Sequence, residues 1–317
     1  MIRVAVVGAG HFGRKHAQIY ASSTGAALVA VCDVDESNRE AVAELYAADF
    51  ISDFRELIGR VDAVSVAVPT TSHHAIACEL LEAGISVLIE KPISATLDEA
   101  EQIIAAAERG RAALQIGHLE RFNPAVTAAS AIVTKPLFFE AHRLSIFTAR
   151  SLDIDVVMDL MIHDLDVVLS FVQSDVREVR AAGVPILTSK VDIANARIEF
   201  ENGCVANLTA SRVSSEHVRK LRFFQPREYV SIDYSAQEAA VVSVKPDAEG
   251  KLSFDSRSLQ IERGEPLRLE IESFLRAVEG EPVRVTGEDG RRALALAVEI
   301  TNKIREHAGR AGVSTLS

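Results

Sequence analysis

The chain has 317 residues, a formal net charge of −11, 48% hydrophobic residues and 25% charged residues. This composition is typical of a soluble globular protein, and the length favours two domains over one. The acidic balance argues against a nucleic-acid partner, and no apolar run approaches the roughly 18 residues that span a membrane. Glycines interrupt the N-terminus where the core of a signal peptide would continue, and three scattered cysteines fit reduced thiols in the cytoplasm.

The first 33 residues follow the pattern of a dinucleotide-binding unit. A β-branched run at 2–7 predicts a buried strand, a helix-compatible segment covers 14–23, and a second apolar run at 27–31 leads to Asp33. The turn between the first strand and the helix reads Gly8-Ala9-Gly10-His11-Phe12-Gly13, which is the G-x-G-x-x-G pattern. The order of strand, glycine turn, helix, strand and acid predicts a nucleotide site.

Each residue type in this pattern has a physical reason. Gly8 allows the tight turn, Gly10 lets the backbone approach a pyrophosphate, and Gly13 lets the helix pack close to the strand. The N-terminus of the helix offers free N–H groups to phosphates. Asp33 lies about 20 residues beyond Gly13, where a carboxylate hydrogen-bonds the ribose hydroxyls and repels a 2′-phosphate. NAD is therefore favoured over NADP, and an ordinary βα turn would leave Asp33 unexplained.

Strands and helices alternate as far as about residue 115. Helices are expected at 36–46, 53–58, 73–82 and 96–108, and further strands at 61–68, 85–89 and 112–116. Thr96 and Glu99 form a capping-box pattern, and Gly110 is expected to end that helix. Such alternation predicts a doubly wound parallel sheet, a Rossmann domain over residues 1–120, with ligands at the carboxyl ends of its strands.

The second half, residues 121–317, has the pattern of an α+β domain. Helices are expected at 124–132, 155–171, 266–278 and 290–307, and strands at 136–147, 176–186, 191–200, 204–213, 218–224, 229–234 and 239–244. Asn202-Gly203 is a strong hairpin signal. Successive strands without helices predict a large, mostly antiparallel open sheet. One face should pack on helices, leaving the other as a substrate wall or a subunit interface.

Polar residues follow three strands of the first half. Pro69, Thr70 and the hydroxyls after them could lie against a nicotinamide ribose or could simply cap the next helix. Glu90-Lys91-Pro92 directly follows a buried strand, at the edge where ligands bind, although a lysine is more often a surface residue. His118, Arg121 and Asn123 could line a cleft at the domain junction or solvate a linker.

Asp159 and His163 are four residues apart, so they share one face of the predicted helix at 155–171. A carboxylate beside an imidazole fixes its tautomer and raises its basicity, as a general base for a hydroxyl requires. Two alternatives remain open. His163 could be a hydrogen-bonded core histidine, or Asp159, His163, Asp164 and Asp166 could bind a metal, although no second cluster completes a ligand shell.

Together these stretches resemble the Gfo/Idh/MocA oxidoreductases over nearly the whole chain. Five motifs carry the resemblance in order: the glycine turn running to His16, the P-x-x-x-H turn from Pro69 to His73, Glu90-Lys91-Pro92, the G-x-x-x-R-F-x-P segment at 117–124, and Asp159-x-x-x-His163. The resemblance implies a Rossmann domain followed by a large open sheet that often builds a homodimer or homotetramer. It also implies reversible oxidation of a secondary alcohol, with NAD(P) as hydride acceptor.

The resemblance further assigns roles to residues. His163 would be the acid/base, Lys91 would hydrogen-bond the reacting hydroxyl, and Asp159 would position histidine and substrate. The residues expected to bind the cofactor are Gly8, Gly10, His11, Phe12, Gly13, Asp33, Pro69, Thr70, His73, Glu90 and Lys91. The residues expected to bind substrate are Lys91, His118, Arg121, Arg150, Asp159, His163 and Arg212. No metal site is expected.

The chain departs from the family at 147–157, where a bulky segment with Arg150 replaces a glycine-rich lead. The segment 156–166 is most similar to the sugar-nucleotide 3-dehydrogenases of lipid A biosynthesis, which oxidise the 3-hydroxyl of UDP-N-acetylglucosamine. A diphosphate could meet several basic side chains, each alternatively a surface charge: Arg143, Arg150, Arg212, Arg219 and Lys220. A dehydrogenase of a free polyol such as an inositol and a non-catalytic NAD-binding regulator remain the alternatives.

Overall fold

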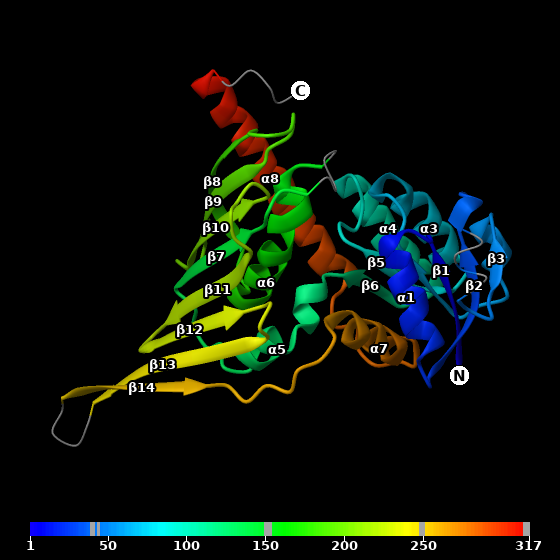
Figure 1. The fold of residues 1–317 in the computed structure, drawn as a ribbon, viewed down its shortest axis with the longest axis horizontal. Helices are drawn as coiled ribbons and strands as arrows, with labels where there is room; N and C mark the ends of the chain where they lie inside the picture. Colours follow the sequence, from blue (N-terminus) through cyan, green and yellow to red (C-terminus); the bar gives the residue numbers. More distant parts are fainter. Residues whose placement is uncertain (39–41, 43–44, 149–153, 247–250, 313–317) are drawn as a thin grey trace. The chain divides into compact units, whose positions relative to one another are not determined.

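The computed structural model describes residues 1–38, 42, 45–148, 154–246 and 251–312. The chain divides into two compact units, Met1–Leu119 with Glu265–Leu294, and Glu120–Gly264 with Ala295–Ser317. Each unit contains one large sheet (Figure 1). Part of the helix expected at 36–46, and Arg150 itself, lie outside the described residues.

The first unit contains a six-stranded parallel sheet in the order β3-β2-β1-β4-β5-β6. Its strands are β1 (Ile2–Val7), β2 (Ala26–Cys32), β3 (Asp49–Ile51), β4 (Ala63–Val66), β5 (Ser86–Glu90) and β6 (Leu114–Gly117). The order reverses direction between β1 and β4, so right-handed crossovers place successive helices on opposite faces. The predicted doubly wound sheet is therefore confirmed; β3, only three residues long, was not predicted.

Helices α1 (His11–Ala21), α3 (His73–Glu82) and α4 (Leu97–Gly110) connect these strands. A short 3₁₀ turn, η1 (Phe54–Leu57), stands where a helix was expected at 53–58. The capping box of α4 is confirmed, because Thr96 Oγ1 accepts from Glu99 N and Glu99 Oε2 accepts from Thr96 N, both at 3.2 Å. The predicted end at Gly110 is confirmed, because Gly110 is the last residue of α4 and the left-handed Arg111 follows it as the C-cap. A Cβ on Gly110 would lie 1.7 Å from Leu81 O, so the position requires glycine for this close approach.

Helix α7 (Pro266–Val278) belongs to the first unit, although the sequence-based division at 120/121 assigned it to the second domain. Its apolar stripe, which includes Leu267, Ile271 and Phe274, shares one core with Val4 and Tyr20. Burial of that stripe against β1 and α1 gives the physical reason for the assignment. The first part of α8 (Gly287–Ala311) lies in the same unit.

The second unit contains an eight-stranded sheet in the order β14-β13-β12-β11-β7-β10-β9-β8. Its strands are β7 (Phe138–Leu144), β8 (Val176–Val184), β9 (Ile193–Phe200), β10 (Val205–Ser211), β11 (Val218–Gln225), β12 (Glu228–Asp233), β13 (Glu238–Pro246) and β14 (Leu252–Ser258). Every described pair is antiparallel except β7 with β10, so the predicted sheet type is confirmed. The hairpin at Asn202-Gly203 is also confirmed, with Gly203 at φ +83°.

Two features of this unit were not predicted. Strand β14 is exposed along its whole length, so its sequence carries no alternation of buried and exposed residues. The helix expected at 155–171 begins as a π-helix, η4 (Val157–Met161), and continues as α6 (Ile162–Val172). Helix α6 packs on one face of the sheet through Phe171, which contacts Phe139 and Phe223. Among the described residues of the chain, no helix is long and apolar enough to cross a bilayer.

Candidate functional site

The glycine turn of the first unit has the geometry that its sequence predicts. Gly8 adopts φ +99°, and a Cβ on it would lie 2.4 Å from Ala67 O. A Cβ on Gly13 would lie 1.6 Å from Gly8 O, so only glycine lets α1 pack this closely on the turn. A Cβ on Gly10 would meet no atom within 4 Å, which leaves open space beside the backbone there.

The N-terminus of α1 offers N–H groups beside that space. Gly10 is the N-cap residue, and among the described residues no side chain caps the helix and no acid occupies its first turn. The adjoining His11 and Phe12 are exposed, with their rings in edge contact at 5.6 Å. The open space and uncapped N–H groups fit a pyrophosphate, which a helix N-terminus stabilises through its dipole.

Asp33, at the end of β2, is bonded directly to this turn. Its Oδ2 accepts from Ala9 N at 2.6 Å and from Asn38 Nδ2 at 3.0 Å, and its Oδ1 accepts from Asp35 N at 2.8 Å. These bonds hold the carboxylate beside the glycine turn with part of its acceptor capacity unused. That placement fits recognition of a ribose next to the pyrophosphate, as the sequence predicts.

Glu90 and Lys91 stand at the carboxyl end of β5. The buried His16 on α1 places its Nε2 2.9 Å from Glu90 Oε1, and the ring nitrogen donates to the carboxylate. Burial would raise the pKa of Glu90, but the hydrogen bond from His16 holds that pKa below its usual range. A charged carboxylate is thereby fixed one residue before the half-buried Lys91.

His73 braces the turns on either side of it. Its Nδ1 and Nε2 lie 3.0 Å from Pro92 O and Val68 O respectively, so the buried ring joins the end of β4 to the segment after Lys91. Burial lowers the pKa of His73, and a neutral ring can donate to only one of the two carbonyls at a time. Pro69 and Thr70 lie next to this brace, at the start of the 3₁₀ turn η2 (Thr70–Ser72).

The second unit carries the other two predicted catalytic residues, Asp159 in η4 and His163 in α6. Both side chains are half-buried. Asp155 begins the segment by accepting from Val157 N and Met158 N through Oδ1, each at 2.9 Å. π-helical turns are often found at functional sites, and this one contains the predicted carboxylate.

A buried ionic cluster fixes α6 to the sheet. Arg143 on β7 donates from Nε and Nη2 to Asp164 at 2.8 and 3.0 Å, and from Nη1 to Glu120 at 3.0 Å. Although burial alone would lower it, the charges of Asp164 and Glu120 raise the pKa of Arg143 well above its usual value. Burial and the charge of Asp164 likewise raise the pKa of Tyr234, whose ring lies 5.1 Å from the guanidinium carbon.

Ion pairs around α6 bear on two predictions, that Arg143 meets a diphosphate and that the aspartates of this helix bind a metal. All three nitrogens of Arg143 are engaged inside the protein, so Arg143 does not offer its guanidinium to a diphosphate. Asp166 is bonded by Arg121, whose Nη1 lies 3.3 Å from its Oδ1. Because arginines engage both Asp164 and Asp166, a metal site built on these two aspartates is disfavoured. Neither pairing was visible in the sequence, since the partners lie 21 and 45 residues apart.

The remaining predicted substrate residues are placed as follows. His118 is buried after β6, and its N–H donates to Ile116 O at 2.8 Å. Arg212 is buried after β10, donating from Nη2 to Ile154 O at 2.6 Å with Nε 3.9 Å from Asp192 Oδ1. Arg212 therefore holds the main chain that leads into η4.

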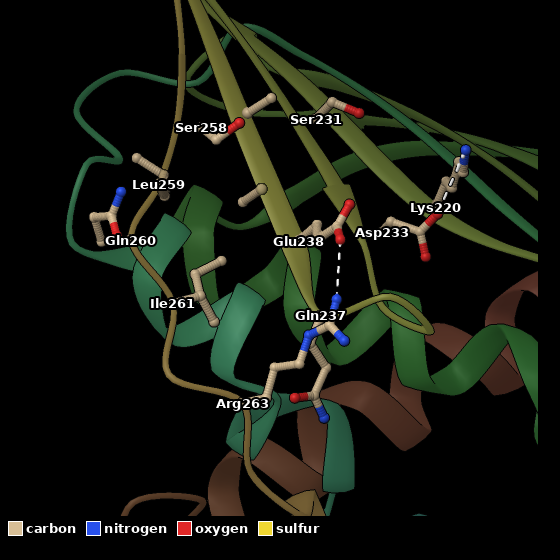
Figure 2. A pocket seen from close by; sticks show the side chains of 12 residues that line it. Lys220, Ser231, Asp233, Gln237, Glu238, Ser258, Leu259, Gln260, Ile261 and Arg263 are labelled. Atoms are coloured by element: carbon tan, nitrogen blue, oxygen red, sulfur yellow. Dashed lines mark hydrogen bonds and ion pairs between the residues drawn. The ribbon is translucent and has the colours of Figure 1, made fainter.

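A polar hollow lies at one end of the eight-stranded sheet (Figure 2). It measures about 550 Å³ and is lined by β11, β12, β13 and the segment after β14. Lys220 pairs with Asp233 at 3.4 Å, and Arg263 pairs with Glu238 at 3.0 Å. Its cations are thus paired with carboxylates. Lys220, one of the basic residues predicted to meet a diphosphate, lines this hollow, and its ammonium group is engaged by Asp233.

Models of known protein families match both halves of the chain. Two family models match the chain, one for an oxidoreductase family with an NAD-binding Rossmann fold at residues 2–118 and one for the GFO/IDH/MocA C-terminal domain at residues 99–227. A UDP-N-acetylglucosamine 3-dehydrogenase of Acidithiobacillus ferrooxidans is 39% identical over 306 residues, which cover 94% of this chain and 96% of that protein.

Similarity extends to solved structures and to enzymes named for other substrates. A structure titled UDP-N-acetylglucosamine 3-dehydrogenase GnnA, from Acidithiobacillus ferrooxidans, gives a TM-score of 0.89 at 37% identity, covering 96% of this chain and 97% of that one. A myo-inositol 2-dehydrogenase of Thermotoga maritima is 27% identical over 327 residues, which cover 96% of this chain and 97% of that protein.

Proposed function

Because this chain belongs to the Gfo/Idh/MocA family of NAD-binding oxidoreductases, we propose that it oxidises the 3-hydroxyl of UDP-N-acetylglucosamine. One observation carries the choice of substrate. The 39% identity to an enzyme named for that reaction extends over 94% of the chain, whereas the full-length inositol dehydrogenase is 27% identical. NAD, when bound, supplies the acceptor for the hydride that leaves the carbinol carbon.

The first unit has the groups to hold that cofactor. The open backbone at Gly10 and the uncapped start of α1 accommodate the pyrophosphate, and Asp33 accepts from the adenosine ribose. His11 and Phe12 flank the pyrophosphate site. Pro69, Thr70 and the brace at His73 follow β4, where the nicotinamide half is proposed to lie. Glu90 fixes the start of the Lys91 turn.

Three side chains are proposed to handle the reacting hydroxyl. The ammonium group of Lys91 hydrogen-bonds the hydroxyl and lowers its pKa, since a nearby cation favours the alkoxide. His163 accepts the proton as general base. Asp159 orients substrate and imidazole and favours the protonated ring once the proton has moved. A non-catalytic regulator would have no need of all three groups.

Recognition of the uridine diphosphate part is proposed to involve basic and polar side chains. His118, Arg121 and Arg150 remain proposed substrate residues, and Arg219 is exposed on β11. For Arg212 the contacts with Ile154 O and Asp192 support holding of the segment before Asp159. If that segment were no longer held in place, turnover of a sugar nucleotide and turnover of a small polyol would both be affected.

The substrate is tested by following NADH formation with UDP-N-acetylglucosamine and with myo-inositol, using the same protein preparation. We expect turnover of the sugar nucleotide with a kcat/KM at least about 100-fold above that for inositol. This ratio corresponds to a few hydrogen bonds that the enzyme makes with the sugar nucleotide and loses with inositol. The double variant Lys91→Met/His163→Ala controls for a contaminating dehydrogenase. Turnover of inositol alone would replace this proposal with the polyol alternative, and inactivity toward every UDP-sugar would exclude it.

We further propose a homodimer or homotetramer formed through the face of the eight-stranded sheet opposite α6. Phe224 lies on that face, with its ring centroid 5.9 Å from Phe138 and 5.1 Å from Tyr229, and it is 37% exposed. Exposed aromatic clusters of this kind mark association surfaces. Light scattering of the wild type and of Phe224→Ser, with Ile58→Ser as an exposed control, should show a smaller mass only for the first variant.

The three free cysteines support action in a reducing compartment, which we take to be the cytoplasm.

A further inference from the structure

Four residues form a closed hydrogen-bonded ring beside the glycine turn. Ala9 donates through its N–H to Asp33 Oδ2 at 2.6 Å and accepts through its carbonyl from Arg14 Nε at 2.8 Å. Arg14 Nη2 donates to Asn38 Oδ1 at 2.7 Å, and Asn38 Nδ2 donates to Asp33 Oδ2 at 3.0 Å. The ring thus joins the turn, the first helical turn of α1 and the segment after β2.

Chemistry fixes the orientation of the amide in this ring. Arg14 can only donate and the carboxylate of Asp33 can only accept, so Asn38 must present oxygen to the first and nitrogen to the second. A carboxylate offers about four lone pairs, of which Ala9, Asn38 and Asp35 use three. A ribose that donates two hydroxyls therefore displaces one of these donors. Asn38 is the one that a side-chain rotation can release, since the other two are main-chain N–H groups.

Release of Asn38 changes what Arg14 presents to the ribose. The guanidinium stays anchored to Ala9 O through Nε, while its Nη2 loses its acceptor. A cation with a free donor then stands near the ribose edge, opposed by the single negative charge of Asp33. A ribose with two hydroxyls satisfies Asp33, whereas a 2′-phosphate meets repulsion from Asp33 and attraction from Arg14.

We propose that Arg14 and Asn38 are specificity-determining residues: Arg14 is a latent binding group for a 2′-phosphate, and Asn38 and Asp33 together keep it from that role. Selection of NAD then depends on the balance of two opposite charges, in addition to the carboxylate itself. The inference concerns cofactor choice alone and is independent of the substrate proposed above.

Calorimetric binding of two probes isolates the adenosine end of the site. The probes are 5′-AMP and adenosine 2′,5′-bisphosphate, and the quantity compared is the ratio of their dissociation constants. The proteins are the wild type, Asp33→Asn, and Asp33→Asn combined with Arg14→Gln. The ratio cancels any general loss of adenosine affinity, and thermal unfolding of each protein checks that it is folded.

We expect the wild type to prefer 5′-AMP, and Asp33→Asn to shift the ratio toward the bisphosphate by about 10- to 100-fold, the worth of one charge-assisted hydrogen bond. Adding Arg14→Gln should abolish most of that shift. The matched control adds Arg109→Gln to Asp33→Asn, because Arg109 is an exposed arginine paired with Glu82 on neighbouring helices, and it should leave the shift intact. A shift that survives Arg14→Gln would overturn the role of Arg14.

Asn38 is tested separately in the wild-type background. Asn38→Ala breaks two sides of the ring and frees Arg14 to pair with Asp33, which reduces the net repulsion of a 2′-phosphate. We expect the ratio to move toward the bisphosphate by about threefold to tenfold, the worth of a partly exposed charge pair. An unchanged ratio would exclude Asn38 from cofactor selection while leaving the test of Arg14 intact.

Discussion

The glycine turn of the first unit and the π-helix and α6 of the second are both proposed to take part in one reaction, but they are built differently. The turn depends on main-chain groups. Gly8, Gly10 and Gly13 act by lacking a side chain, and Asp33 bonds an N–H group 24 residues away. Helix α6 is held by buried charges, chiefly Arg143 with Asp164 and Glu120. The contacts of the glycine turn follow a local sequence motif, whereas the ion pairs that hold α6 join residues 21 and 23 positions apart.

The largest effect is expected at His163, because this residue of the second region is the proposed acid/base of the reaction. His163→Ala should lower kcat by about 10²- to 10⁴-fold, because general acid–base catalysis contributes that much. Binding of NAD, measured by calorimetry, should not change, since the residue lies outside the glycine turn. His217→Ala, which removes an exposed histidine, serves as the control. Unchanged turnover would exclude His163 as the acid/base.

The second prediction concerns the charge network. Arg143→Met leaves Asp164 and Glu120 buried without their cation, which should cost about 3–5 kcal/mol in the free energy of unfolding. The control is Arg222→Met on the neighbouring strand, whose partner Glu140 lies 3.9 Å away and whose side chain is 43% exposed. That variant should cost less than about 1 kcal/mol. If urea denaturation shows equal losses of unfolding free energy for the two variants, the buried network contributes no more to stability than an exposed ion pair.

Two glycines separate stability from binding in the main-chain site. Gly13→Ala would place a Cβ 1.6 Å from Gly8 O, so the turn must shift, and overpacking of this kind costs about 1–3 kcal/mol. Gly10→Ala meets no atom within 4 Å and should leave the melting temperature unchanged, yet its methyl group occupies space that the pyrophosphate needs. NAD affinity should therefore fall in both variants and stability only in the first. A lower melting temperature for Gly10→Ala would contradict the inference that the space beside this residue is open.

These expectations match what the sequence could and could not reveal. The parallel sheet, the turn, Asp33 and the order of Lys91, Asp159 and His163 follow from short segments whose residue types have direct physical reasons. The partners of Arg143 and the ring through Arg14 and Asn38 depend on contacts between distant segments, which periodicity does not encode. Strand β14 was missed because an exposed strand has no buried face to impose alternation.

Glu270 shows a further limit, because its position in the apolar stripe of α7 conceals an ionisable group. It is fully buried, and neither carboxyl oxygen has a hydrogen-bond partner among the described residues. Burial, and then the charge of Glu90, raise the pKa of Glu270 well above its usual value. The folded protein therefore keeps this proton at pH values where the unfolded chain has lost it.

The sign of the resulting pH dependence follows. Above about pH 4.5 the unfolded chain binds fewer protons at Glu270 than the folded one, so the stability contributed by this group falls as pH rises toward the folded pKa. Relative to Glu270→Gln, the wild type should lose up to about 1.4 kcal/mol per pH unit. Urea denaturation at three pH values between 5.5 and 7.5 measures this slope. The control Glu272→Gln, on a half-exposed neighbour, should follow the wild type, and parallel curves for Glu270→Gln would contradict the prediction.

The smallest effect is expected at a feature that the sequence predicts directly. Thr96→Ala removes the side chain that accepts from Glu99 N, which should cost about 1 kcal/mol in the free energy of unfolding. Glu99→Ala removes the reciprocal bond to Thr96 N. Because each side chain completes the other's cap, the double variant should lose less than the two single losses together, by about 0.5 kcal/mol or more. Strict additivity would mean that the two halves of the box act independently, and that even a motif of four adjacent residues cannot be treated as one cooperative unit.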